Sequence, residues 1–125
     1  MNTPEGILCA RTHEWILEDG DFALIGLTDW QANNMGDIVS VDLPENGVRY
    51  SKDEIFATVE SVRLACELYM PVSGRVVEVN DLLINTPDLI NENSYSNWLI
   101  KIEPENFQQD SQELIEYSDY IDEVS

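Results

Sequence analysis

The stretch that decides the fold is EIFATVESVRLACELYMPVSG, which spans residues 54–74. Its opening is rich in β-branched and aromatic side chains and predicts a strand over Glu54–Glu60. Glu67–Met70 predicts a second strand, and Ser61–Cys66 between the two is expected to be an exposed turn. A further strand is predicted over Arg75–Val79. The centre of the chain therefore favours a β-hairpin followed by another strand.

Short apolar runs separated by turn residues continue on both sides of this hairpin and predict more strands. Trp15–Leu17 and Phe22–Leu27 flank an Asp-Gly pair, which is a strong signal for a tight hairpin. Ile38–Leu43 alternates with period two, so Ile38 and its i+2 neighbours are expected on one face. Trp98–Ile102 is the last predicted strand and is closed by a proline.

Two short helices are expected between these strands. Thr28 is a candidate N-cap with Gln31 three residues later, as in a capping box, and Gly36 is a candidate stop. This first helix is roughly two turns long. Residues 80–84 are expected to be irregular, and Thr86-Pro87-Asp88 predicts the start of a second short helix.

The C-terminal tail has a different pattern from the rest of the chain. An apolar stripe at helical spacing runs through it, formed by Phe107, Leu114, Tyr117, Ile121 and Val124. No Gly/Ser/Pro-rich linker precedes the stripe, so we expect one or two helices over residues 105–125 that pack on the strands. The prediction is a single domain over residues 1–125, mainly β, with short helices and a helical C-terminus.

The charge of the chain limits its partners. With 6 basic and 25 acidic residues the formal net charge is −19. Nucleic acids and anionic membrane surfaces bind basic patches, so neither is expected as a partner, whereas a basic protein surface is compatible. Two cysteines, Cys9 and Cys66, in a chain without a signal-peptide pattern predict reduced thiols and a cytoplasmic protein.

Motifs along nearly the whole chain resemble those of the glycine cleavage system H protein family. They keep the family's order and spacing, which makes the set specific although each motif alone is weak. The matching segments are His13-Glu14-Trp15, Ile25-Gly26-Leu27-Thr28-Asp29, Gly36-Asp37-Ile38-Val39, Val41-Asp42-Leu43-Pro44, Glu60-Ser61-Val62, Pro71-Val72-Ser73-Gly74, Glu78-Val79-Asn80, Leu89-Ile90-Asn91 and Trp98-Leu99-Ile100-Lys101-Ile102.

This resemblance implies a flattened β-barrel, or barrel-sandwich hybrid, with helices at its ends. Family members carry an aminomethyl group on a lipoyl arm between glycine decarboxylase and aminomethyltransferase, and dihydrolipoyl dehydrogenase reoxidises the arm. The H protein is a substrate of these enzymes and has no catalytic residues of its own. The resemblance therefore implies glycine cleavage or lipoyl-handling enzymes as partners, and we expect a monomer.

Arg63 stands where the family has its lipoyl lysine, directly after Glu60-Ser61-Val62. A lipoyl amide forms at an amine that can become neutral and nucleophilic, whereas a guanidinium is delocalised and stays protonated. The remaining lysines, Lys52 and Lys101, lack this sequence context. We therefore predict that the lipoyl cofactor is absent from this chain.

Other departures surround the predicted arm. Glu14 matches the family residue that accepts a hydrogen bond from the loaded arm, but Asn34 replaces a histidine common in the family. No clustered Cys/His spacing or calcium loop predicts a metal site. Cys66 is expected near the exposed turn, where a thiol-based redox role is a third and weaker hypothesis.

Two main hypotheses follow from these residues. The first is a carrier-family scaffold that docks on glycine cleavage or lipoyl-handling enzymes but is not lipoylated at Arg63. The second is a non-lipoylated interaction or regulatory protein that keeps only the acidic docking surface. Restoration of lipoylation by Arg63→Lys would separate them.

Overall fold

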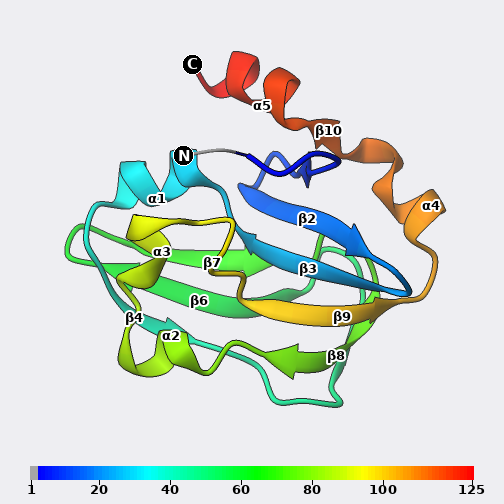
Figure 1. Cartoon of the computed structure of the whole chain (residues 1–125), viewed down its shortest axis with the longest axis horizontal. Coiled ribbons are helices and arrows are strands. Elements are labelled where there is room, and N and C mark those ends of the chain that lie inside the picture. The colour runs from blue at the N-terminus through cyan, green and yellow to red at the C-terminus, as the bar shows by residue number, and fades with distance from the viewer. Residues whose placement is uncertain (1–2) are drawn as a thin grey trace.

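The computed structural model describes residues 3–125 as two antiparallel sheets packed face to face, with helices at the ends (Figure 1). The larger sheet has the order β10-β1-β2-β3-β9-β8-β5, and the smaller one has the order β4-β6-β7. The strands are β1 Leu8–Cys9, β2 Glu14–Asp19, β3 Phe22–Leu27, β4 Ile38–Asp42, β5 Arg49–Tyr50, β6 Ile55–Ser61, β7 Ala65–Tyr69, β8 Gly74–Val79, β9 Ile100–Pro104 and β10 Ile115–Glu116. The mainly β prediction is confirmed.

The helices are short and lie at the ends and edges of the sheets (Figure 1). They are α1 Asp29–Met35, α2 Leu82–Asn85, α3 Leu89–Glu92, α4 Phe107–Asp110, the 3-10 helix η1 Ser111–Glu113 and α5 Tyr117–Val124. Among the helices of residues 3–125, none is long and apolar enough to cross a membrane.

Two apolar clusters hold the fold together. The larger lies between the two sheets and includes fully buried side chains such as Ile25, Val59, Leu68 and Ile102. The smaller joins the N-terminal strands to the tail and is formed by Ile7, Cys9, Trp15, Tyr95 and Tyr120. Gly26 is needed at their junction because a Cβ there would lie 2.6 Å from ring atoms of Trp15.

The first hairpin and the first helix agree with the sequence prediction. β2 and β3 pair antiparallel around Gly20, whose φ of 64° is in the left-handed region that glycine adopts without strain. Thr28 caps α1 and its side-chain oxygen accepts the N–H of Gln31, and Gly36 ends the helix with a φ of 77°.

The expected alternation along the strand that begins at Ile38 is wrong. β4 has a register irregularity between Ile38 and Ser40, so Ser40 is exposed although it lies two residues after buried Ile38. Beyond the bulge, Val41 and Leu43 pack on the core. An extra residue in one strand reverses which face the following side chains take, and period-two counting across it fails.

The turn of the central hairpin is shorter than predicted. β6 continues to Ser61 and β7 begins at Ala65, so the loop contains only residues 62–64. Cys66 is a strand residue and not part of an exposed turn, which corrects the sequence prediction. Residues 82–84, which were expected to be irregular, belong to the helix α2. The helix α3 is preceded by Asp88 as N-cap in place of Thr86.

The C-terminal tail is not one continuous helical stripe. Asn106 caps α4, and β10 then interrupts the helical segments by pairing with β1 before α5 begins. The sequence analysis missed β10 because strands of two residues carry no periodic pattern. On α5, Tyr120 is buried, and Ile121 and Val124 pack against the smaller cluster.

Candidate functional site at the tip of the β6–β7 hairpin

Ser61 fixes the conformation of the hairpin tip. Its hydroxyl oxygen accepts the backbone N–H groups of Arg63 and Leu64, each at 3.1 Å. Its own backbone N–H donates to the carbonyl of Leu64 at 2.8 Å. A side chain that accepts two N–H groups of its own turn replaces water at those donors. The tip is therefore a defined turn that presents Val62, Arg63 and Leu64 outward.

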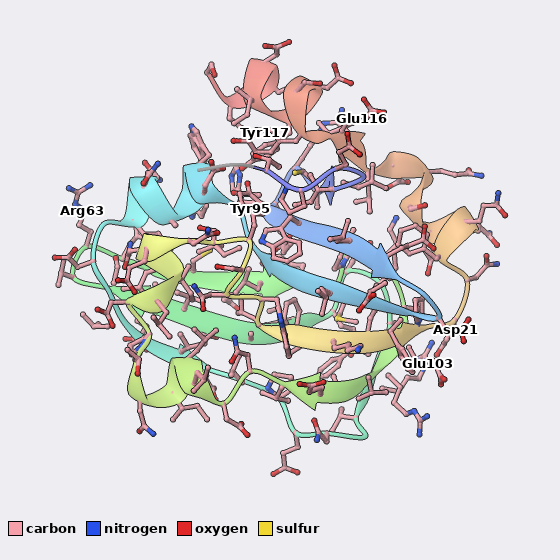
Figure 2. All side chains as sticks on the ribbon, viewed as in Figure 1. Asp21, Arg63, Tyr95, Glu103, Glu116 and Tyr117 are labelled. Carbon is pink, nitrogen blue, oxygen red and sulfur yellow. The ribbon has the colours of Figure 1, made fainter. Side chains whose placement is uncertain are left out.

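The Arg63 side chain leans toward the C-terminal end of α1 (Figure 2). Its Nη1 donates to the backbone carbonyl of Asn34 at 3.4 Å. A Cβ on Gly36 would lie 3.4 Å from its Nε, so the guanidinium passes directly over that glycine. The N–H of Val62 also donates to the carbonyl of Asp37, at 3.1 Å. The cation thus sits beside a carbonyl of the last turn of α1, where the helix dipole is negative.

Arg63 differs from the other basic residues in its partners. Five of the six arginines and lysines form an ion pair, namely Arg11 with Glu123, Arg49 with Glu105, Lys52 with Glu113, Arg75 with Glu103 and Lys101 with Asp19. Within residues 3–125, Arg63 is the one arginine or lysine side chain that pairs with no carboxylate. A guanidinium has five N–H donors, so one contact with a carbonyl leaves most of them available.

Exposed apolar side chains lie at the same end of the molecule as this cation. The exposed fractions of Val62, Leu64 and Val39 are 70%, 39% and 54%. Leu82 and Ile84 on α2, which contacts β4, are 67% and 56% exposed. These account for five of the seven large apolar residues exposed among residues 3–125. All five belong to elements at the same end of the molecule, which we call the tip face (Figure 1).

Of the predicted site residues, the structure brings Arg63, Ser61, Val62 and Asn34 together but leaves Glu14 apart. Asn34 takes part through its backbone carbonyl, a contact that residue type does not reveal. Glu60 is exposed on β6 and pairs with Ser40 and Ala65 across the sheet.

Glu14 is fully buried and its carboxylate already has partners. It accepts the N–H of Tyr69 at 2.9 Å and a hydrogen bond from the Thr12 hydroxyl. Burial raises the pKa of Glu14, and the hydrogen bonds from Thr12 and Tyr69 oppose that rise. In this arrangement the carboxylate faces protein donors beneath the surface and not the hairpin tip.

Cys66 is half-buried in β7, and the prediction that it is exposed at the turn is wrong. Gln31 Nε2 donates to its sulfur at 3.5 Å, a contact that the sequence analysis missed. Burial raises the pKa of the Cys66 thiol, the hydrogen bond from Gln31 opposes that rise, and the nearby charges of Glu14 and Glu67 add to it, so that the pKa stays raised. Because the thiolate is the reactive form, this environment opposes a redox role.

Neither lysine lies in the hairpin turn. The side chains of Lys52 and Lys101 are 24% exposed, and their ammonium groups are 3.0 Å and 3.8 Å from Glu113 and Asp19. Within residues 3–125, no three His, Cys, Asp or Glu side chains gather as a metal-binding group.

Comparison with known proteins decides the family. The sequence pattern of the glycine cleavage H-protein family matches residues 8–125. The chain belongs to the glycine cleavage H-protein family. It is 42% identical over 127 residues to the glycine cleavage system H protein of Halothermothrix orenii, with 99% of each chain covered. It is 44% identical over 110 residues to that of Geobacillus thermodenitrificans, with 87% of each covered.

A solved structure of the family has the same fold. The crystal structure of the glycine cleavage system H protein from Mycobacterium marinum superposes with a TM-score of 0.87, covering 98% of both chains at 31% sequence identity. The flattened barrel-sandwich prediction is therefore confirmed along with the family.

Proposed function

We propose that this chain is an H-protein docking scaffold that carries no lipoyl group. The observation that supports the proposal is the guanidinium of Arg63 at the hairpin tip, where the family resemblance places the lipoyl lysine. In the rest of the tip, the Ser61 hydroxyl holds the turn through two hydrogen bonds, and Val62 is exposed beside Arg63.

The chemistry of the tip does not fit covalent attachment of lipoate. Amide formation needs an amine that loses its proton and attacks the acyl carbon, and the tip offers a guanidinium in its place. Lys52 and Lys101 are poor substitutes because both are largely covered and held by carboxylates. No step of the family's aminomethyl transfer is therefore assigned to this chain.

In this proposal residues 1–125 form a single domain of a monomeric, cytoplasmic protein. Residues 105–125 are an extension that packs on the strands. It is a binding partner of glycine cleavage or lipoyl-handling enzymes and is not itself catalytic. Glu60, Ser61 and Val62 form the recognition context of the tip, and Glu14 and Asn34 occupy the family's arm-docking positions. With Glu14 fully buried, its role here is to hold Tyr69 and Thr12.

A second candidate is an interaction or regulatory protein outside glycine cleavage. The observation that favours it is the charge of −19, which suits a basic partner surface without any need for an arm.

A decarboxylation assay tests the first candidate against the second. Glycine decarboxylase would be supplied with carboxyl-labelled glycine and with ligase-treated wild-type protein or its Arg63→Lys variant, and labelled CO2 would be counted. We expect release above background only with the variant. Equal release with both proteins would refute the missing carrier function. No release with either would mean that productive docking has been lost, which favours the second candidate.

A further inference from the structure

A groove runs along the end of β8, where this strand lies beside α2 (Figure 1). It is formed by two adjoining cavities with volumes of about 690 Å³ and about 470 Å³. Both cavities are lined by the same three residues, Glu78, Val79 and Asp81. The larger cavity extends over Leu82 and Trp98, and the smaller one reaches Glu45 in the loop after β4. The shared lining makes the two cavities one continuous groove.

Hydrogen bonds hold the walls of this groove in place. The N–H of Gly47 donates to the carbonyl of Val76 at 2.8 Å, which holds the turn after Glu45 against β8. At the other end, Asn80 Nδ2 donates to the carbonyl of Trp98, also at 2.8 Å. The groove is therefore formed before any ligand arrives, and little ordering of the backbone opposes binding.

The carboxylates of the groove have no counterion within the chain. Glu45, Glu78 and Asp81 line it, whereas no arginine or lysine does. Within residues 3–125, none of these three carboxylates forms an ion pair. Lys101 lies opposite Glu78 in the β8–β9 ladder, but its ammonium group is 3.8 Å from Asp19. The groove thus presents negative charge that the protein itself leaves unpaired.

The remaining lining suits a cation with an apolar body. Asn97 Nδ2 donates to two backbone carbonyls, so its amide oxygen is the group left for a ligand. Trp98 brings an indole ring, which attracts cations to its face. Leu82, which is 67% exposed, and Val79 offer apolar contacts. Among residues 3–125, no three His, Cys, Asp or Glu side chains gather to hold a metal ion, which favours an organic cation.

We propose that this groove binds a linear aliphatic polyamine. Its ammonium groups donate hydrogen bonds to the carboxylates of Glu45, Glu78 and Asp81, and its methylene segments lie against Val79 and the Trp98 ring. The field of a chain with a charge of −19 concentrates such cations near its surface. This inference goes beyond the proposed function, because it involves neither Arg63 nor lipoyl chemistry. A bound polyamine stabilises the folded chain by mass action.

The test is isothermal titration calorimetry of the full chain with spermidine at physiological salt. We expect saturable binding of one spermidine per chain. The double variant Glu78→Gln/Asp81→Asn should weaken it about tenfold or more, because two charge-assisted contacts are lost. Asp81 is a conservative position for this change, since its side chain makes no capping hydrogen bond to α2. Circular dichroism of each variant verifies that it is folded.

Glu18→Gln/Asp21→Asn is the matched control. It removes the same number of charges at the first hairpin, from two residues that line neither cavity and form no ion pair. Its affinity for spermidine should stay within about twofold of the wild type, because separated surface charges are screened by salt. Equal weakening in both double variants would show a diffuse cloud of counterions, and would overturn the inference, as would the absence of saturable binding.

Two probes with the same charge as spermidine test the kind of ligand. Hexaamminecobalt(III) is compact and has no methylene chain, so it should bind more weakly. Trilysine with blocked ends is a peptide, and tighter binding of trilysine than of spermidine would overturn the inference in favour of a basic protein segment. Equal binding of hexaamminecobalt(III) and spermidine would overturn it as well. In NMR spectra, spermidine should shift the indole N–H of Trp98 and leave that of buried Trp15 in place, whereas the reverse pattern would place the ligand elsewhere.

Discussion

The tip face differs in its charge pairing from the side of the molecule that residues 105–125 cover, which we call the tail-covered side. At the tip, one unpaired cation and five exposed apolar side chains face solvent. Around the tail, three basic residues, Arg11, Arg49 and Lys52, are paired with carboxylates from residues 105–123. Figure 2 shows Arg63 and Glu103 at opposite ends of the molecule. The tip face leaves its cation and its apolar side chains exposed, whereas the tail-covered side pairs its cations with carboxylates of the same chain.

A network of buried hydroxyl groups strengthens the tail-covered side. The Tyr120 hydroxyl lies 2.8 Å from both Thr28 Oγ1 and His13 Nδ1. Tyr95 and Tyr117 each donate to the carboxylate of Asp29 at 2.8 Å (Figure 2). The tail therefore joins the N-cap region of α1 through hydrogen bonds as well as through packing. The difference indicates that the tail-covered side supplies stability and the tip face is available for partners.

The largest expected effect is on the tail-covered side. Tyr120→Ala should lower the free energy of unfolding by about 3–5 kcal/mol, because it empties a buried aromatic site. Leu64→Ala at the tip should change it by less than about 0.5 kcal/mol. Urea denaturation of both variants measures the contrast. Equal losses would mean that the two sides do not divide stability and binding between them.

The next largest effect on stability is expected at Glu14, which is fully buried. Glu14→Ala should cost about 1–3 kcal/mol, since the N–H of Tyr69 loses its acceptor. Glu14→Gln should keep most of that bond.

The pH dependence of Glu14→Gln has a defined sign. Because the folded pKa of Glu14 is raised by burial, wild-type protein gains stability relative to this variant as the pH falls, and loses that gain as the pH rises through the folded pKa. Urea midpoints at pH 7.5 and 5.5 check this. Parallel shifts in both proteins would contradict it.

His13 gives a smaller effect of opposite sign on the tail-covered side. Burial lowers the pKa of His13, so its contribution is present above its usual value of about 6.5 and is lost as the pH falls. His13→Asn suits the φ of 83° and removes this titration. Unfolding midpoints from pH 7.5 to 5 should fall less in the variant than in the wild type. An equal fall in both would show that Tyr120 and Trp30, the neighbours of His13, do not hold it neutral.

The smallest expected effect is that of Arg63 on folding. Arg63→Ala should change the free energy of unfolding by less than about 0.5 kcal/mol, since its one contact is an exposed hydrogen bond. A loss above about 1.5 kcal/mol would show that Arg63 is a structural cap of α1. The hairpin tip would then contribute to stability, contrary to the contrast drawn with the tail-covered side.

The sequence predicted the features that local chemistry controls. Gly20 in the first turn and Thr28, Gln31 and Gly36 around α1 each meet a local backbone requirement, and all were placed correctly. The hairpin that carries Arg63 also followed from its apolar runs.

Features that depend on distant partners were not predictable. β1, β5 and β10 contain two residues each and exist only because a neighbouring strand pairs with them. The bulge after Ile38 and the contact of Cys66 with Gln31 are likewise products of the folded arrangement. For Arg63, residue type led to the prediction that the lipoyl-accepting amine is missing, but it did not indicate the carbonyl of Asn34 that the side chain meets.

The central claim is the proposal that Arg63 is the residue that prevents lipoylation of this scaffold. The most direct test is intact mass after co-expression with a lipoyl ligase and lipoate, for the wild-type chain and for Arg63→Lys. The account predicts a lipoyl mass on the variant only. A lipoyl mass on the wild-type chain would contradict it, and peptide mapping would then locate the modified residue.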